Sequence, residues 1–259
     1  MKICNNNLTV IEPYEFLDGG YSMTLPQYRM FQYIIGETFV KDGLSKDTFY
    51  EVSINNFASY FGQSHKEAYD SLVMSLRKGN VPIIDLPEKV FTEGAKDSKR
   101  RKFILYNGIQ YDTDGCLIKV RLAPELVEMY NKLGEEGRYY AKYILSHTRN
   151  MKSINSIRLF RLMNKWRSTN EYTNVGVVSF ELEELKRLLG FSEGEYKNWS
   201  DFNRYVLQPS IAEIHKEAYL QVTVEVKKQG KKVTRLVFGV INKNKKFKQE
   251  AKGGELSDK

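Results

Sequence analysis

Residues 199–214 read WSDFNRYVLQPSIAEI, and the apolar side chains of this stretch recur at helical intervals. One broad face carries Phe202, Val206, Leu207, Ile211 and Ile214. This spacing predicts an amphipathic helix over residues 200–218. The opposite face then presents Asp201, Arg204, Tyr205 and Gln208 to solvent.

Pro209 lies inside this predicted helix. Proline has no backbone N–H and its ring crowds the preceding turn, so a kink is expected at this point. A proline at this position would also fit a helix that begins later than residue 200, closer to Pro209. The sequence leaves both interpretations open.

The segments on either side of this helix complete a recurring motif. After it, residues 220–226 and 233–240 alternate as two strands joined by KKQGKK at residues 227–232, which predicts a hairpin. Before it, a short strand at residues 177–179 leads into a leucine-rich helix that stops at Gly190. Strand, helix, turn, helix and hairpin in this order are typical of a winged helix.

The first half of the chain repeats this order. A strand at residues 50–53 leads through the N-cap Ser53 into a helix that ends at Gly62, and residues 64–77 form the next helix. Strands are predicted at residues 82–86, 101–106 and 117–122. An opening helix precedes each copy, at residues 24–39 and 153–166.

The repeat predicts an α+β fold of two tandem winged-helix domains. The glycine-rich segment at residues 133–137 is the expected connector. We therefore divide the chain into an N-terminal domain of residues 1–135, a C-terminal domain of residues 136–243, and a disordered charged tail of residues 244–259.

The charge of the chain favours a polyanionic partner. Lys and Arg number 40 against 32 Asp and Glu, which gives a net charge of +8 and a pI near 9.2. No apolar run approaches the roughly 18 residues of a membrane span, and no signal peptide opens the chain. The sequence thus predicts a cytoplasmic protein that binds nucleic acid, with no membrane association.

Residues suited to catalysis or metal binding do not gather in the sequence. A nicking enzyme needs clustered histidines, whereas His65, His147 and His215 are isolated. Gly230-Lys231-Lys232 lacks the upstream glycine and the hydroxyl of a phosphate-binding loop. Glu181, Glu183 and Glu184 suggest acid/base or metal chemistry, but acidic residues in a first helical turn more often complement the helix dipole.

The two cysteines and the aromatic residues also have simple explanations. Cys4 and Cys116 lack the spacing of a zinc site. The 31 Tyr and Phe residues fall mostly at core-like spacings rather than forming platforms for single-stranded nucleic acid. We therefore expect no enzymatic activity, no cofactor and no metal.

Two groups of residues are candidates for DNA contact. Helix side chains can reach base edges in the major groove, and basic hairpins straddle phosphates. The base-reading candidates are Lys197, Ser200, Asn203, Arg204 and Tyr205. The phosphate-binding candidates are Lys227, Lys228, Lys231, Lys232 and Arg235 in the C-terminal wing, and Lys66, Lys78, Lys99, Arg100 and Arg101 in the first half, where residues 99–102 are interpreted as a second basic wing.

The second half resembles the C-terminal domain of iteron-binding plasmid replication initiators. The similarity runs through residues 156–160, 185–190 and 199–214, and extends over roughly residues 25–240. Members of this family often have consecutive basic residues where this chain has Arg204-Tyr205. Tyr205 therefore either contacts DNA differently or packs against the protein.

The resemblance implies an origin-binding protein with two states. Initiators of this kind bind repeated double-stranded origin sequences as monomers, and dimers joined through the N-terminal domain repress their own gene. The host replication initiator and the replicative helicase are the implied protein partners. A dedicated winged-helix transcriptional repressor remains the alternative from another class.

Overall fold

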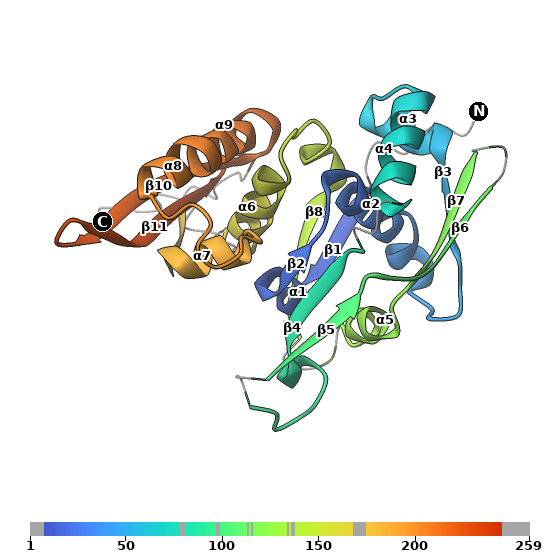
Figure 1. The fold of residues 1–259 in the computed structure, drawn as a ribbon, viewed down its shortest axis with the longest axis horizontal. Coiled ribbons are helices and arrows are strands. Elements are labelled where there is room, and N and C mark those ends of the chain that lie inside the picture. Colours follow the sequence, from blue (N-terminus) through green and yellow to red (C-terminus); the bar gives the residue numbers. More distant parts are fainter. Residues whose placement is uncertain are drawn as a thin grey trace, which may run out of the picture.

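The computed structural model describes residues 8–77, 81–96, 99–112, 114, 116–133, 135, 138–167 and 175–244. The predicted tail after residue 244 and the candidate Lys78 lie outside these residues. Figure 1 shows two bodies of mixed helix and sheet lying side by side, with helix α6 between them.

The N-terminal body contains three small sheets, with strand orders β1-β8, β2-β4-β5 and β3-β7-β6. Its elements are β1 (Thr9–Pro13), α1 (Tyr14–Asp18), β2 (Gly20–Ser22), α2 (Leu25–Asp42), β3 (Tyr50–Ser53), α3 (Ile54–Phe61), α4 (His65–Arg77), β4 (Ile83–Pro87), η1 (Glu88–Val90), β5 (Arg100–Ile104), β6 (Tyr106–Tyr111), β7 (Leu117–Leu122), α5 (Pro124–Asn131), β8 (Tyr140–Ile144) and η2 (Leu145–His147).

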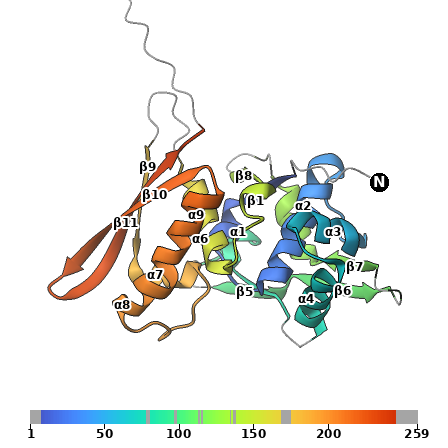
Figure 2. The ribbon, with the colours of Figure 1, turned by 90° about the horizontal axis from the view of Figure 1, so that it is seen from above.

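The C-terminal body has one sheet of order β10-β11-β9 covered on one face by helices (Figures 1 and 2). Its elements are α6 (Ile154–Lys165), β9 (Val175–Glu181), α7 (Leu182–Leu188), α8 (Trp199–Phe202), the π-helical turn η3 (Asn203–Leu207), α9 (Gln208–Glu217), β10 (Leu220–Gln229) and β11 (Lys232–Asn242).

The predicted pseudo-repeat is present in both bodies. In each motif the first strand pairs with the last strand, β3 with β7 and β9 with β11. The second strand of the motif, β6 or β10, pairs with the other side of the last strand, at an edge of the sheet. The first helix of each helix-turn-helix is followed by a left-handed glycine, Gly62 at φ 64° and Gly190 at φ 84°. Glycine takes this conformation at little cost, which allows the sharp turn into the next helix.

The local signals that predicted the long opening helix also hold it in place. The Thr24 hydroxyl accepts the backbone N–H of Gln27, and the Gln27 side chain accepts the N–H of Thr24, which together form a capping box. The periodic residues Tyr28, Phe31 and Ile35 are fully buried. Helix α2 thus forms the centre of the N-terminal core.

The strands predicted at residues 82–86, 101–106 and 117–122 are present as β4, β5 and β7, but β6 was not predicted. The wing of the first winged helix is the β6–β7 hairpin, whereas β5 pairs with β4 in a separate sheet. Sequence reasoning missed β6 because Asn107-Gly108 reads as a turn. Gly108 instead lies at a bulge, and a Cβ there would come within 3.3 Å of the Phe49 ring.

The segment after the predicted domain boundary contacts both bodies. Strand β8 pairs with β1 at the start of the chain, and α6 packs against β8, α9 and α1. Leu8, Tyr143, Phe160 and Ile214 belong to the same continuous cluster of buried side chains. No helix in the described part of the chain is long and apolar enough to span a membrane.

Candidate nucleic-acid interface

The helix predicted from residues 199–214 forms, with its apolar face inward. Phe202, Leu207 and Ile214 are fully buried, and Ser200, Arg204 and Tyr205 are exposed. The helical run begins at Trp199, so the alternative of a later start is wrong.

The predicted irregularity at Pro209 takes the form of a π-helical turn. The Gln208 N–H bonds to the Asn203 carbonyl, five residues back, and Pro209 follows immediately. A proline cannot donate to the carbonyl four residues earlier and clashes with it, and the wider π turn relieves that conflict. The turn lies directly beneath the candidate base-reading residues.

Arg204 and Tyr205 form a pair on the outer side of this turn. The Arg204 guanidinium carbon lies 5.3 Å from the centre of the Tyr205 ring, and Tyr205 is 60% exposed. Tyr205 is therefore not a core residue, and its ring packs against Arg204 at the surface. Asn203 is half-buried and its side-chain oxygen accepts the Gln208 amide at 3.1 Å.

The reading helix and the C-terminal wing share one groove. This groove, of about 380 Å³, brings together three lysines of the wing with the segment that leads into the helix. Its charged and hydroxyl side chains are Lys197, Ser200, Lys228, Lys231, Lys232 and Glu183. Of the base-reading candidates, Lys197 and Ser200 therefore face the same space as the wing lysines. Asn203, Arg204 and Tyr205 follow on the same helix and do not line the groove.

The C-terminal wing carries three lysines that have no ion-pair partner in the described part of the chain. It projects from the C-terminal body as a two-stranded ribbon that turns at Gly230, φ 61° (Figure 2). Lys227 pairs with Glu225, and Arg235 pairs with Glu181 of β9. Among the described residues no ion pair involves Lys228, Lys231 or Lys232, so these three cations are the ones available to an anionic ligand.

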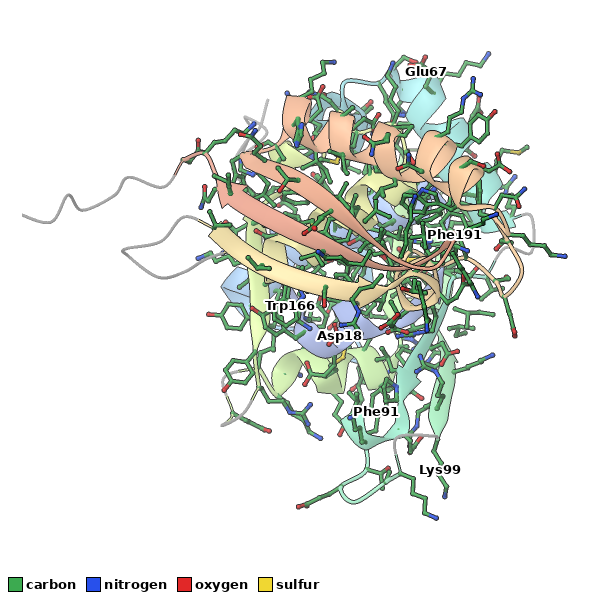
Figure 3. All side chains as sticks on the ribbon, turned by 90° about the vertical axis from the view of Figure 1, so that its left-hand side faces the viewer. Asp18, Glu67, Phe91, Lys99, Trp166 and Phe191 are labelled. Carbon is green, nitrogen blue, oxygen red and sulfur yellow. The ribbon has the colours of Figure 1, made fainter. Side chains whose placement is uncertain are left out.

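The first-half candidates lie on two separate features. Lys66 is exposed in the first turn of α4, the second helix of the N-terminal helix-turn-helix. Lys99, Arg100 and Arg101 lie on the β4–β5 hairpin, which is not the wing. Figure 3 shows Lys99 far from the C-terminal reading helix.

Two of these hairpin arginines already have partners within the protein. Arg100 bonds to Asp85 at 2.6 Å. Arg101 pairs with Glu88 and lies 4.7 Å above the Phe91 ring. The true N-terminal wing ends in Asp112 and Asp114 rather than in lysines, so the expectation of two basic wings was wrong.

The acidic residues considered for catalysis are paired with cations. Glu183 bonds to Lys186 at 2.9 Å and Glu184 to Arg187 at 2.7 Å, both within α7. Glu181 pairs with Arg235. In the part of the chain that the structure describes, no three His, Cys, Asp or Glu side chains are grouped as a metal site.

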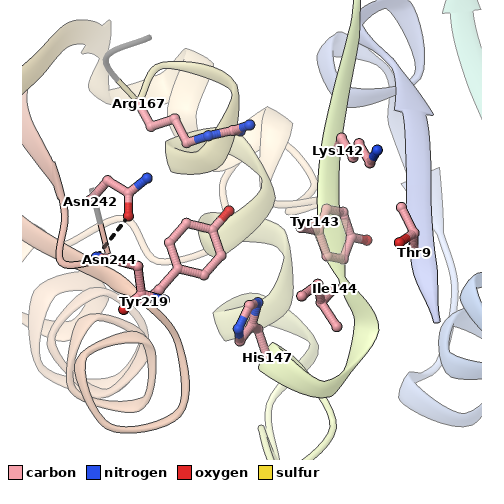
Figure 4. Close-up of a pocket in the computed structure, with 9 residues that line it drawn as sticks. All are labelled: Thr9, Lys142, Tyr143, Ile144, His147, Arg167, Tyr219, Asn242 and Asn244. Atoms are coloured by element: carbon pink, nitrogen blue, oxygen red, sulfur yellow. Dashed lines mark hydrogen bonds between the residues drawn. The ribbon is translucent and has the colours of Figure 1, made fainter. Parts of the chain in front are cut away.

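A second pocket, of about 320 Å³, separates β8 from the C-terminal strands (Figure 4). His147 and Tyr219 face each other in it, with ring centres 4.6 Å apart. Burial lowers the pKa of His147, because the charged imidazolium is less well solvated there. On this side, therefore, the two bodies contact each other through His147 and Tyr219, next to α6.

Two winged helices, one with a reading helix and a lysine-rich wing around a single groove, define a DNA-binding protein. A model of the initiator replication protein WH1 domain matches residues 9–164, and a model of the initiator Rep protein WH2 domain matches residues 181–240. The first match alone spans more than half of the chain. The chain belongs to the family of initiator replication proteins, which are DNA-binding proteins without catalytic activity.

The chain is also similar to solved structures, and it shares its fold with the first of them. The Pi initiator protein in complex with iteron DNA has a TM-score of 0.70 and 18% identity, over 92% of this chain and 98% of that one. Domains 2 and 3 of RctB have a TM-score of 0.45 and 13% identity, over 92% and 88%. The WH1 domain of MSBI1.176, a replication protein isolated from a multiple sclerosis patient, has a TM-score of 0.33 and 18% identity, over 42% and 81%.

Proposed function

We propose that this protein initiates the replication of a plasmid by binding directly repeated origin sequences, the iterons. The observation that carries the proposal is the single groove between the reading helix and the wing, with its available lysines. Helices in the major groove and wings on the backbone read DNA in this way. The Pi initiator, which has the same fold, was solved with iteron DNA. Plasmid binding would place the protein in the cytoplasm.

Within this proposal the two groups of candidate residues have different tasks. Arg204 and the adjoining Tyr205 ring read bases, together with Asn203 on the same turn, and Lys197 and Ser200 contribute from the groove. Lys228, Lys231 and Lys232 hold phosphates, with Lys227 and Arg235 along the same ribbon. Lys66 makes a phosphate contact from the N-terminal body.

The phosphate contacts assigned to Lys78, Lys99, Arg100 and Arg101 stay predictions. Because Arg100 and Arg101 must first leave Asp85 and Glu88, we expect them to contribute less than the free lysines of the wing.

We extend the proposal to a dimer that represses its own gene. Strand β5 lies at the edge of its sheet, and Ile83 and Ile104, directly opposite each other in β4 and β5, are 41% and 42% exposed. An open edge with an apolar pair favours strand addition by a second copy. Ile104→Lys should then shift a concentrated sample from dimer to monomer in sedimentation, and an unchanged dimer would place the contact elsewhere.

The experiment that tests the main proposal is DNA binding across a salt series. Duplexes carrying the direct repeats of the protein's own replicon are compared with scrambled duplexes. Tight binding to the repeats that persists at moderate salt supports the proposal. Base contacts contribute a part of the binding free energy that salt does not screen. Equal and steeply salt-sensitive binding to both duplexes would contradict it.

A dedicated transcriptional repressor would pass this binding test as well. The replication role, and with it the contacts to the host initiator and helicase, is tested by plasmid maintenance. A plasmid whose only copy of the gene carries Arg204→Ala should be lost from its host. If the plasmid is maintained without any functional copy of the gene, the protein is not the initiator and repression remains as its function.

A further inference from the structure

The two winged helices are joined through two buried arginines of α6. Arg158 and Arg161 are one helical turn apart and only 6% and 2% exposed. Arginine is almost never buried unless its charge and its donors are compensated. The groups that contact these two guanidinium groups therefore show how the two bodies are held together.

The partners of Arg161 all belong to the N-terminal body. Its Nε donates to Glu12 at 2.6 Å, and its Nη1 donates to the Tyr21 hydroxyl. The guanidinium carbon also lies 4.7 Å from the centre of the Tyr28 ring. Helix α6 is therefore anchored on the N-terminal side, independently of the C-terminal winged helix.

Arg158 contacts both bodies at once. Its Nη2 donates to the Tyr21 carbonyl of β2 at 2.9 Å, and its guanidinium lies 4.4 Å above the Tyr21 ring. Its Nη1 donates to the carbonyl of Leu189, the residue that ends α7. Leu189 and Gly190 form the turn of the C-terminal helix-turn-helix, so one planar group links that turn to the N-terminal sheet.

We propose that Arg158 is a positioning residue that fixes the C-terminal reading helix at one orientation to the N-terminal winged helix. This inference rests on the DNA-binding function proposed above. If both domains bind one DNA site, a fixed orientation makes Arg158 a determinant of the spacing, in base pairs, between the parts of the site that the two domains contact. A guanidinium offers donors in a rigid fork, and lysine offers a compact charge on a flexible stem. Lysine therefore cannot hold both carbonyls in one geometry.

Gly190 provides a second and independent way to disturb the same contact. A Cβ on Gly190 would lie 2.0 Å from Nη1 and 2.7 Å from Cζ of Arg158. Gly62 is the equivalent residue of the N-terminal helix-turn-helix, also left-handed, and a Cβ there would meet nothing within 4 Å. Gly62→Ala therefore introduces similar backbone strain without touching Arg158, which makes it the matched control.

The first test needs no DNA and measures the distance between the two bodies. In a Cys4→Ser background, spin labels are placed on Cys116, in the N-terminal wing, and on Gln221→Cys, on the exposed face of β10. The parent and Gly62→Ala should give one narrow distance distribution. Arg158→Lys and Gly190→Ala should give a broader or displaced one, and the parent distribution in both variants would overturn the proposal.

The choice of variants keeps this test decisive. Arg158→Lys retains the buried cation over Tyr21 and is expected to fold. Near-parent circular dichroism confirms folding for each variant before distances are compared. Arg158→Lys and Gly190→Ala disturb the contact between Arg158 and the α7 turn from opposite sides. A change in the distance distribution that both variants share therefore cannot come from a defect of only one of them.

The second test adds DNA and varies the spacing within one repeat. Inserted or deleted base pairs separate the parts bound by the two domains. The parent should prefer one spacing, and Arg158→Lys should weaken binding about tenfold at that spacing, the equivalent of roughly 1.4 kcal/mol. At other spacings its affinity should equal that of the parent. An equal loss at every spacing would overturn the spacing role.

The two tests separate the inference from the function on which it rests. If the parent shows no preference for repeated DNA, the proposed function fails, and the label distances still decide whether Arg158 fixes the orientation. If the parent prefers repeats and the distances do not respond to Arg158→Lys or Gly190→Ala, the function stands and the positioning role is rejected.

Discussion

Arg161 of α6 and Glu12 of β1 form an ion pair of 2.6 Å that is almost completely removed from solvent, with side chains 2% and 0% exposed. Burial by itself lowers the pKa of Arg161, but the negative charge of Glu12 and the neighbouring Tyr21, Tyr28 and Tyr143 raise it well above its usual value. The guanidinium therefore stays charged inside the protein. The pair ties the segment between the two winged helices to the first strand of the chain.

Removal of one partner of this pair should strongly destabilise the protein. Glu12→Gln leaves the Arg161 charge buried without its counter-ion, which should lower the free energy of unfolding by about 3–5 kcal/mol. Chemical denaturation of parent and variant measures this loss. Asp18→Asn is the control, because Asp18 pairs with Lys165 of the same helix but is 52% exposed, and should cost about 1 kcal/mol or less. Equal losses in both variants would contradict the role of burial.

Arg204→Ala should reduce both the affinity and the selectivity of DNA binding. A bidentate contact to a base edge contributes about 1–3 kcal/mol, and its loss should relax specificity at one position of the repeat. Fluorescence anisotropy with the repeat and with singly substituted repeats measures both effects. Gln221→Ala, on the exposed face of β10, should bind like the parent. Unchanged selectivity in Arg204→Ala would remove this residue from the base-reading group.

Lys231→Ala should weaken binding to repeated and scrambled DNA alike. A lysine that neutralises one phosphate releases about one counter-ion, so the slope of log affinity against log salt should fall by about one unit. Arg100→Ala should change this slope less, because Asp85 already neutralises Arg100. An equal change in both variants would mean that the β4–β5 hairpin also lies on the DNA backbone.

His147 should make the protein less stable as the pH falls. Its pKa is lowered in the folded state by burial beside Tyr219, whereas in the unfolded chain it is about 6.5. Below that value the unfolded state binds the proton first, so stability is lost as the pH falls through the folded pKa. The stability difference between about pH 7.5 and about pH 5 should therefore shrink in His147→Gln.

The control for this measurement is His65→Gln on the exposed surface of α4, which should keep the parent pH dependence. Comparison of variants with the parent cancels the contribution of carboxylates, which titrate in all of them. If His147→Gln and the parent respond equally to pH, burial of this ring has no part in acid sensitivity.

Local signals in the sequence were sufficient for most of the fold. The period of the apolar residues, the Ser53 cap, the left-handed Gly62 and Gly190 and the alternating strands around Gly230 are all where they were predicted. These features depend on neighbours within a few residues. The reading helix and its wing could be predicted for the same reason.

The failures have long-range causes. The β4–β5 and β6–β7 hairpins could not be told apart as separate sheet or wing, because the pairings that distinguish them, β4 with β2 and β7 with β3, join residues distant in the chain. The Lys99, Arg100 and Arg101 run resembles a basic wing in sequence. The partners of its arginines, Asp85 and Glu88, are set by strand register, which the sequence pattern does not reveal.

The sequence by itself determined two winged helices, an amphipathic helix over residues 199–214 and a lysine-rich turn at residues 227–232, because periodicity and turn chemistry are properties of contiguous residues. Tertiary structure alone decided that these two elements share one groove, and that Arg158 and Arg161 are buried between the bodies rather than solvated. An arginine on a helix looks the same in sequence in either case. Its burial depends on the Tyr21 carbonyl, the Glu12 carboxylate and aromatic rings that lie more than 100 residues away along the chain.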